Sequence, residues 1–384
     1  MKILVMGQYS SDVDSGAAGT EIQTVRALRR RGHEVDTVWA DGLRPRRLRH
    51  GGLHYLFEFP SRLRHAMLDR LRRERYDVVH VSEMHGYLAA KAHRRVGAGA
   101  FIHRSHGLEL RVLHDLAPWE RLYSSDDRAL VRRIGSQLIS RLLMRRGRKI
   151  VKYADGHIVS ATQCRDFLRS ELGVPSERVD VIPQAAPDSY ILTPPRQMDS
   201  ERLKSILYVG QFAFFKAPMI LARVLDGIIR ERDDVEITWV CAAAHHRQAR
   251  ALLGTRARRR VRFLDWLPQE KLMDVYDRHG TFLFPSFFEG FGKASLEAMT
   301  RGLCVIAADN GGARDVIEHG ATGVLVPTGD IAAMTEACLK VLDDPETGLA
   351  LSSSARKAAE GYSWGRVARE TEEFYERTLR GRAG

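Results

Sequence analysis

Short apolar runs alternate with longer amphipathic segments in two separate series along the chain. This pattern restricts the folds that the chain can adopt. The runs are too short to be helices, and the apolar residues between them recur at helical spacing. Short buried strands joined by helices are typical of parallel sheets that are covered on both faces. The first series ends near residue 172, and the second begins at residue 205. We therefore predict an α/β fold with two doubly wound parallel sheets.

In the first half, the apolar runs predict strands at 2–6, 34–39, 54–57, 77–81, 100–104 and 156–160. The segments between them predict helices at 20–31, 62–75, 85–96, 126–153 and 162–172. In the second half, strands are predicted at 205–209, 235–240, 261–264, 281–285, 304–307 and 323–326. Helices are predicted there at 217–232, 245–253, 269–278, 293–301, 331–342, 347–361 and 364–380.

A proline-rich stretch separates the two series. Four prolines lie within residues 183–203, which show little periodicity, and such stretches are typical of linkers. We predict a first domain at 1–183, a linker at 184–203 and a second domain at 204–362. The last helix, within 363–384, is expected to return to the first domain.

Residues 281–301 carry the strongest functional pattern of the second half. A short apolar run ends at a proline, a loop with two glycines follows, and a predicted helix begins at Lys293. Backbone N–H groups at a helix start bind anions. Glu289 precedes the helix and Glu297 lies inside it, and a carboxylate accepts hydrogen bonds from two neighbouring hydroxyls. A single glutamate would fit a solvated acid, but the combination predicts a phosphate site between two sugar rings.

Two lysines lie near predicted helix starts, where a cation is unfavourable against the helix dipole unless an anion lies between them. Lys216 follows the strand at 205–209, and Lys293 follows the loop that contains Glu289. A solvated side chain is the alternative for each. We predict that Lys216 meets the anion bound at the helix start.

The order E-G-F-G-x-x-x-x-E at 289–297 resembles the E-x(7)-E signature of retaining GT-B glycosyltransferases of family 4. The segment G-Q-F-A-F-F-K-A at 210–217 is similar to that family's G-R-L-x-x-x-K-G. Its lysine is present, whereas Gln211 stands in place of the arginine and Ala217 in place of the second glycine. Relatives usually carry an uncharged residue at the position of Lys293, so we hypothesise that this lysine replaces the missing arginine.

Further segments resemble the same family, in the family's order along the chain. They are S-G-A-A-G-T-E at 15–21, the His106–Gly107 pair after a predicted strand, V-I-P-Q-A-A at 181–186, and A-D-N-G-G-A-R-D-V-I-E-H-G-A-T-G-V-L-V-P at 308–327. Together, the matching segments extend from residue 15 to residue 327.

The resemblance implies the GT-B architecture, in which two Rossmann-like domains face each other across a cleft. It implies transfer of a hexose from a nucleotide diphosphate sugar, with UDP as the expected nucleotide, to an acceptor hydroxyl with retention of configuration. It also implies that neither a metal nor another cofactor takes part. The first domain would bind the acceptor, and the second would bind the nucleotide sugar.

The resemblance also implies site residues. Catalytic roles fall to His106 at the hexose, Lys216 at the diphosphate and Glu289 at the hexose hydroxyls. Donor binding falls to a larger set: Gly19, Gly210, Gln211, Leu267, Phe291, Gly292, Lys293, Ala294 and Glu297. Within that set, Glu297 would hold the ribose hydroxyls, and Leu267 would lie near the base.

Two other functions fit the same fold. A nucleotide-sugar 2-epimerase would need acid and base carboxylates in the first domain, where Glu21, Glu83 and Glu109 are the candidates expected in loops. A catalytically inactive nucleotide-sugar-binding protein is conceivable because of Gln211. The D-x-D at 12–14 is the pattern that holds a divalent metal in another glycosyltransferase fold, but its surroundings offer no further ligands, so we predict no metal site.

The formal net charge of +12 is concentrated in the first half. Residues 1–200 contain 34 lysines and arginines against 23 acidic residues, an excess of 11, which leaves an excess of 1 for the rest. We therefore expect the first domain to meet something acidic, namely a small-molecule, lipid-linked or acidic acceptor, or an anionic membrane. The basic helices show little aromatic interleaving, so no nucleic-acid partner is expected.

Two further sequence features favour the cytoplasm. No apolar run approaches the roughly 18 residues of a membrane-spanning helix. The 4 cysteines show no C-x-x-C spacing and are expected to be reduced. We expect a cytoplasmic protein, with a peripheral position at the inner membrane face as a further hypothesis.

Overall fold

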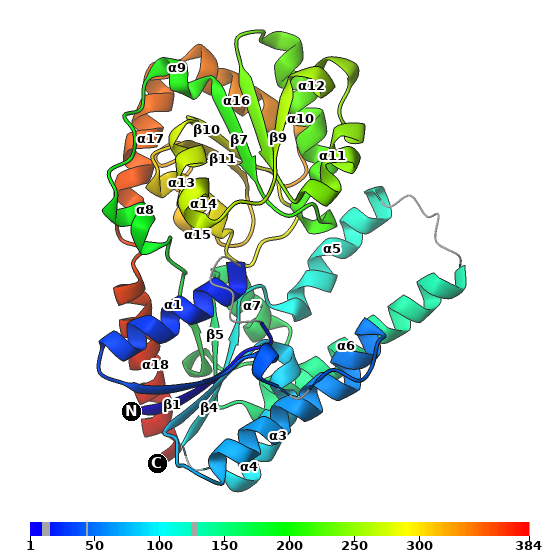
Figure 1. The fold of residues 1–384 in the computed structure, drawn as a ribbon, viewed down its shortest axis with the longest axis vertical. Coiled ribbons are helices and arrows are strands. Elements are labelled where there is room, and N and C mark those ends of the chain that lie inside the picture. Colours follow the sequence, from blue (N-terminus) through cyan, green and yellow to red (C-terminus); the bar gives the residue numbers. More distant parts are fainter. Residues whose placement is uncertain (10–15, 44, 98, 124–129, 384) are drawn as a thin grey trace. The chain divides into compact units, whose positions relative to one another are not determined.

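The computed structural model describes residues 1–9, 16–43, 45–97, 99–123 and 130–383, and the chain forms two compact units (Figure 1). The first unit consists of Met1–Pro183 with Trp364–Gly384, and the second consists of Gln184–Ser363. Within the described residues, each unit contains one six-stranded parallel sheet surrounded by helices. The predicted α/β class with two doubly wound parallel sheets is confirmed.

The first sheet has the strand order β2-β1-β3-β4-β5-β6. Its strands are β1 (Lys2–Met6), β2 (Glu34–Val38), β3 (Val78–Ser82), β4 (Ala100–Ser105), β5 (Gly156–Val159) and β6 (Val179–Val181). The helices of this unit are α1 (Gly16–Arg30), α2 (Gly51–Leu53), α3 (Phe59–Leu71), α4 (Tyr87–Val96), α5 (Glu109–Tyr123), α6 (Leu130–Tyr153), α7 (Thr162–Ser170) and α18 (Trp364–Ala383). Single turns are η1 (Ala40–Gly42), η2 (His54–Glu58), η3 (Met84–Gly86) and η4 (Ser176–Arg178).

The register of the first sheet brings the carboxyl ends of β1, β3 and β4 to one edge. Met6 lies opposite Val81, and Ser82 lies opposite Arg104. All five residues of β3 and all six of β4 are buried, as expected for central strands of a parallel sheet. The loops that follow these strands therefore start side by side, which positions the polar cluster described below.

The C-terminal helix α18 packs against α1 and β4 of the first unit. Phe374 and Tyr375 on this helix are fully buried, and the hydroxyl of Tyr375 is hydrogen-bonded to Nδ1 of His80 on β3. Gly156 at the start of β5 allows this close approach, since a Cβ there would lie 2.7 Å from Cζ of Phe374. These contacts explain why the last helix belongs to the first unit rather than to the second.

The second sheet has the strand order β12-β11-β10-β7-β8-β9. Its strands are β7 (Ser205–Val209), β8 (Glu236–Val240), β9 (Val261–Leu264), β10 (Thr281–Phe284), β11 (Cys304–Ala308) and β12 (Val324–Val326). The helices of this unit are α8 (Asp188–Leu192), α9 (Ser200–Leu203), α10 (Pro218–Glu231), α11 (His246–Leu252), α12 (Thr255–Arg260), α13 (Gln269–Asp277), α14 (Lys293–Thr300), α15 (Ala313–Val316), α16 (Ile331–Asp343) and α17 (Pro345–Ala359). Single 3₁₀ turns are η5 (Phe214–Lys216) and η6 (Ala243–His245).

The stretch 184–203 is not the linker that its prolines predict. It forms α8 and α9 and belongs to the second unit. Tyr190 is buried, and its hydroxyl donates to the carbonyl of Gln269. Arg301 is fully buried, and its guanidinium donates to the carbonyls of Tyr190 and Thr193 at 2.8 and 2.6 Å. Prolines interrupt regular helices here, but buried side chains and hydrogen bonds tie the segment to the unit.

Other local differences follow from short or ambiguous patterns. Residues 54–57, predicted as a strand, belong to the π-helical turn η2, which runs directly into α3. A short apolar run fits either a strand or a helix segment, and the proline in the first turn of α3 favours the helix. The helix α5 and the strand β6 are present in the structure, although the sequence pattern predicts neither of them. In the described part of the chain, no helix has both the length and the apolarity that are needed to cross a membrane.

Candidate active site

In the second unit, the loops after two neighbouring strands meet at one edge of the sheet. β7 pairs with β10, although about seventy residues separate them in the sequence. The loop after β7 ends in η5, and the carbonyl of Phe215 accepts hydrogen bonds from the N–H groups of Phe287 and Phe288 in the loop after β10. Strand order therefore places Lys216 beside Glu289.

Lys216 and Glu289 form an ion pair with 2.6 Å between Nζ and Oε1. Their side chains are only 15% and 7% exposed. The ammonium group also lies 5.2 Å from the ring centre of Phe284, the last residue of β10. A cation and a carboxylate are thus held together at the carboxyl edge of the sheet, where α/β proteins bind ligands.

The backbone around this pair has a geometry that favours small residues. Gly292 has φ +82° directly before α14, so the loop enters the helix through a left-handed residue. Ala217, directly after Lys216, has φ +52°, although it carries a Cβ. Gly311 lies so close to Glu289 that a Cβ would be 2.2 Å from the carbonyl oxygen of Glu289. The loop carrying Glu289 therefore packs directly on the backbone that follows β11.

Glu297 lies inside α14 and is 8% exposed. Its Oε2 accepts a hydrogen bond of 3.1 Å from the hydroxyl of Tyr276, and its Oε1 lies 3.8 Å from Nζ of Lys293. Burial raises the pKa of Glu297 above its ordinary value, and the effect of burial outweighs the opposing effects of Lys293 and Tyr276. The structure thus pairs the second predicted lysine with the second predicted glutamate.

The other donor-binding candidates of the second unit are distributed around these pairs. Gly210 lies against Tyr208, where a Cβ would be 2.4 Å from the hydroxyl oxygen. The side chain of Gln211 is exposed, and Phe291 is buried in the core. Ala294 lies in the first turn of α14, and its carbonyl accepts from Tyr276 at 3.4 Å. Leu267 follows β9, which is two strands away from β7.

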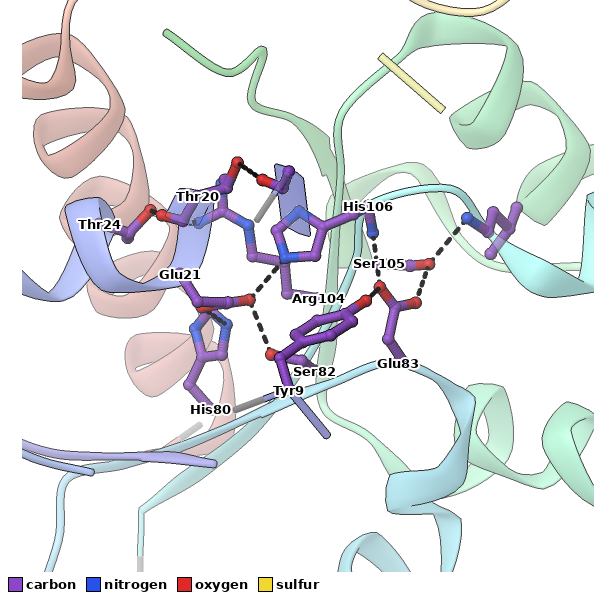
Figure 2. Close-up of polar contacts among 12 residues, drawn as sticks. Tyr9, Thr20, Glu21, Thr24, His80, Ser82, Glu83, Arg104, Ser105 and His106 are labelled. Carbon is purple, nitrogen blue, oxygen red and sulfur yellow. Dashed lines mark hydrogen bonds and ion pairs between the residues drawn. The ribbon is translucent and has the colours of Figure 1, made fainter. Parts of the chain in front are cut away.

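His106 and Gly19 belong to the first unit. His106 directly follows β4, and its Nε2 lies 2.9 Å from Oε1 of Glu21 on α1 (Figure 2). Ser82 at the end of β3 donates to the same carboxylate oxygen at 2.7 Å. Burial alone would raise the pKa of Glu21, but His80 and His106 hold it well below its ordinary value. His106 is therefore held at the strand edge by a buried carboxylate.

Two expectations about α1 are corrected by its extent. α1 begins at Gly16, so Gly19 lies within the helix instead of in the loop that the sequence predicts. Glu21 likewise lies on α1 and is fully buried, so it is not a loop carboxylate. The D-x-D at 12–14 and Ser15 lie outside the described residues.

A second carboxylate cluster lies beside His106, and its hydrogen bonds were not foreseen (Figure 2). Glu83 follows β3 with φ +66° and accepts hydrogen bonds from the hydroxyl of Tyr9 at 2.6 Å and from Oγ of Ser105 at 2.8 Å. The N–H of His106 also donates to Glu83 at 3.2 Å. Ser105 lies 3.4 Å from Glu109, and burial, together with the charge of Glu83, raises the pKa of Glu109 well above its ordinary value.

Glu83 and Glu109 are the two epimerase candidates that the structure brings together. Tyr9 and Ser105 are the residues that sequence reasoning missed. A signal for Ser105 exists, because it lies at a strand end directly before the His106–Gly107 pair. No local signal identifies Tyr9, since its partner lies 74 residues further along the chain.

Arg104 adds a buried cation to the first unit. Its side chain is fully buried on β4, and Nη1 donates to Oγ1 of Thr24 on α1 at 3.3 Å (Figure 2). Within the described residues, Nε and Nη2 have no hydrogen-bond partner. The guanidinium therefore lies against α1, the helix that also carries Glu21.

Two family models together match most of the part of the chain that carries these residues. The family model described as Glycosyl transferases group 1 matches residues 203–344, and the model described as Glycosyltransferase Family 4 matches residues 15–189. The D-inositol 3-phosphate glycosyltransferase of Corynebacterium efficiens is 29% identical over 219 residues, which are 52% of this chain and 51% of the relative. This chain spans about half the length of the curated relatives that it matches.

Solved structures share the fold over nearly the full chain. Sucrose-phosphate synthase from Thermosynechococcus elongatus has a TM-score of 0.77 at 20% identity, and the match covers 98% of both chains. HepE of Anabaena in complex with UDP-glucose has a TM-score of 0.69 at 17% identity, and the match covers 97% of this chain and 98% of that protein. At these identities, the likeness shows the fold alone.

Proposed function

The chain belongs to the glycosyltransferases of family 4 and group 1, and from this premise we propose that it transfers a hexose from a nucleotide diphosphate sugar to an acceptor hydroxyl. In the proposed reaction, the bond between the anomeric carbon and the diphosphate breaks, and a bond to the acceptor oxygen forms with retention of configuration. The acceptor O–H bond breaks as well, and the departing diphosphate leaves with the electron pair of the broken sugar–oxygen bond and takes up the proton. No metal or other cofactor is part of the proposal.

The ion pair between Lys216 and Glu289 is the observation that carries this proposal. Both groups lie at the carboxyl edge of the sheet, beside the start of α14. In the proposed complex, the Lys216 ammonium meets the diphosphate, and the Glu289 carboxylate accepts hydrogen bonds from the hexose hydroxyls. Charge that develops on the departing diphosphate is stabilised by Lys216 and by the N–H groups of Lys293 and Ala294 at the start of α14.

The pair of Lys293 and Glu297 extends the proposed site along α14. Glu297 holds the ribose hydroxyls, and Tyr276 orients its carboxylate through the hydrogen bond of 3.1 Å. Lys293 supplies the second cation for the diphosphate, in place of the arginine that Gln211 replaces. A ribose bound at Glu297 and a hexose bound at Glu289 would place the diphosphate between two carboxylates and next to two lysines.

Donor and acceptor classes are proposed from the relatives. HepE binds UDP-glucose, which supports UDP as the nucleotide here. The corynebacterial relatives act on D-inositol 3-phosphate, which supports an acceptor that carries both hydroxyls and a phosphate. Such an acidic acceptor matches the excess of basic residues in the first half of the chain.

The proposal is tested by binding and then by turnover. A thermal-shift screen with UDP, GDP, ADP and dTDP identifies the nucleotide, because a ligand that binds only the folded state raises the melting temperature. The matching UDP- or other nucleotide-hexose is then incubated with inositol 3-phosphate, with and without EDTA. We expect a glycosylated product whose anomeric configuration by NMR equals that of the donor, and an unchanged rate in EDTA. Binding of the nucleotide sugar without turnover on any acceptor would indicate a catalytically inactive nucleotide-sugar-binding protein.

One observation supports a second candidate, a nucleotide-sugar 2-epimerase. Glu83 and Glu109 lie together beside His106, and the pKa of Glu109 is raised by burial and by Glu83. Two neighbouring carboxyl groups, one of them with a raised pKa, offer the acid and the base that an epimerase needs in the first unit. Incubation of the donor without acceptor separates the two reactions, since only an epimerase converts the sugar under those conditions.

A further inference from the structure

The longest helix of the first unit carries an unusual charge pattern. α6 contains eight lysines and arginines and no aspartate or glutamate over its 24 residues. An isolated surface helix normally mixes both signs of charge, which stabilises it through pairs one turn apart. A helix with cations alone repels itself, so its charge pattern indicates a partner that is negatively charged.

One stripe of α6 combines exposed apolar and basic side chains. Leu138, Leu142, Arg145 and Lys149 are spaced by four, three and four residues, so they lie along one side of the helix. Leu138 is 57% exposed and Leu142 is 36% exposed. Arg145, Lys149 and the flanking Arg141 are exposed as well. The side of α6 that faces solvent is thus apolar at one end and basic along its length.

The neighbouring turn of the chain extends this surface. α2 and η2 pack along α6, and a Cβ at Gly52 would lie 2.8 Å from Cγ2 of Ile139. Arg146 donates to the carbonyl of Leu56 at 2.8 Å, and its guanidinium lies 4.4 Å from the ring centre of Phe57. The ring of Phe57 is 49% exposed. An aromatic ring and one further cation, Arg146, therefore lie next to the stripe on α6.

The segment that leads into α2 adds positive charge. Arg46, Arg47 and Arg49 are exposed, and they precede Leu53, which is 40% exposed. Two acids flank this segment in the sequence: the carboxylate of Asp41 accepts from the N–H of Gly42, and that of Glu58 is engaged by His54 and by the N–H groups of Arg47 and Leu48. We call the surface formed by Leu53, Phe57, Leu138 and Leu142, with the surrounding arginines and lysines, the α6 face.

We propose that the α6 face docks the protein on an anionic lipid bilayer. A polyanion in solution would satisfy the cations but would leave the aliphatic side chains in contact with water. A bilayer with acidic headgroups accepts both, because basic side chains bind the headgroups while apolar ones enter the interface between headgroups and acyl chains. Single exposed apolar residues are common on proteins, whereas several in one strongly basic surface mark an interaction site.

This inference does not rest on the transfer reaction, and its test uses neither donor nor acceptor. The full chain is co-sedimented with vesicles of pure phosphatidylcholine and with vesicles that contain phosphatidylglycerol, at low and at high salt. We expect binding to the anionic vesicles at low salt, strong weakening at high salt and little binding to the neutral ones. Absence of binding to the anionic vesicles at low salt would overturn the proposal.

Charge-reversed variants locate the docking surface. The combination Arg141→Glu, Arg145→Glu and Lys149→Glu lies on the α6 face. Each basic residue near an anionic surface contributes roughly fivefold to partitioning, so we expect at least about a hundredfold loss of binding.

The matched control changes the same charge in the second unit, through the exposed residues Arg259→Glu, Arg262→Glu and Arg278→Glu. We expect this control to lose less than about tenfold in binding. Equal losses in the two variants would mean that net charge alone drives binding, and this would overturn the assignment to the α6 face.

Apolar variants test the membrane against a soluble polyanion. We expect Leu138→Ser with Leu142→Ser to weaken vesicle binding about tenfold, because binding scales with the apolar area that enters the interface. The control is Leu192→Ser with Leu252→Ser, which removes two exposed leucines from the second unit and should not weaken binding. Retention on heparin together with vesicle binding that is insensitive to the α6-face leucines would overturn the proposal and assign the face to a soluble polyanion.

Discussion

Lys216 and Glu289 lie 73 residues apart in the sequence, and 2.6 Å separates Nζ of the lysine from Oε1 of the glutamate. Both side chains are largely buried, so neither charge is fully solvated when the other is removed. In the proposed reaction, each group exchanges this partner for part of the donor. The pair therefore links donor binding to charge stabilisation at the leaving group, and the first predictions concern its members.

Replacing Lys216 by alanine is expected to lower kcat by roughly a hundredfold or more, which is the scale for the loss of one electrostatic stabiliser of the transition state. The donor dissociation constant should change less, because the charge matters most as the diphosphate departs. Steady-state kinetics and calorimetric titration of the same variant separate the two effects. Lys340→Ala, at an exposed pair with Glu336, is the control. A folded Lys216→Ala variant with near-normal kcat would contradict the assignment.

Lys293 is expected to supply the cation that Gln211 does not. Lys293→Ala should then lower kcat about as much as Lys216→Ala does. The double variant Lys293→Ala with Gln211→Arg should recover part of the loss, because an arginine is restored at the position where related proteins carry one. Kinetics of the single and double variants test this directly. If Lys293→Ala is harmless, the residue serves only as the partner of Glu297 at 3.8 Å.

Glu297→Ala is expected to weaken donor binding, because two ribose hydroxyls lose a charged acceptor that contributes about 1.5–3 kcal/mol. This corresponds to a dissociation constant raised by roughly ten- to a hundredfold. Calorimetric titration with the preferred nucleotide sugar measures the change. The control Glu318→Ala removes an exposed acid from the same unit and should leave the constant unchanged. An unaltered constant for Glu297→Ala would remove this residue from the site.

Glu109 should make the stability of the first unit dependent on pH. Burial and the charge of Glu83 raise its pKa in the folded state, so the folded chain holds a proton that the unfolded chain releases above about pH 4.5. The stabilising effect is fully present below the unfolded pKa and is lost as the pH rises through the folded pKa. Melting temperatures from pH 4 to pH 8 should therefore fall more steeply in the wild type than in Glu109→Gln. Parallel curves for the two proteins would mean that Glu109 is ionised at neutral pH.

The fold could be predicted from sequence wherever strands are central and buried. Runs such as 3–6 and 100–102 are apolar because both faces of a parallel strand are covered, and such runs are short because strands are short. The run at 54–57 is also short and largely apolar, but only half of it is buried, since Tyr55 and Phe57 are exposed, and it continues into a helix. Composition alone does not distinguish these two environments.

Part of the candidate site could also be predicted from the sequence, namely the part that depends on local spacing. Glu297 and Lys293 are one helical turn apart, so sequence spacing alone brings them together. The approach of Lys216 to Glu289 depends on the pairing of β7 with β10, which no local pattern specifies. The contact of Tyr9 with Glu83 depends in the same way on neighbouring strands of the first sheet. The sequence therefore predicted Lys216 and Glu289 as site residues, but it did not specify the contacts that depend on strand order.

The last prediction concerns the segment 184–203, whose prolines suggest a linker. Arg301 fixes this segment to the second unit, because its buried guanidinium donates to carbonyls of Tyr190 and Thr193 and pairs with Asp277 at 2.6 Å. Arg301→Ala leaves a largely buried carboxylate and two carbonyls without their donor. We expect the free energy of unfolding to fall by about 3–5 kcal/mol, as measured by urea denaturation.

The control for this prediction is Arg314→Ala, which breaks the more exposed pair with Asp309 and should cost no more than about 1 kcal/mol. Proteolysis under native conditions gives an independent measure, since a segment released from the unit is cleaved faster. We expect Arg301→Ala to be cleaved within 184–203 sooner than either the wild type or the control. Equal stability and equal cleavage in all three proteins would mean that the segment behaves as the linker that its prolines suggest.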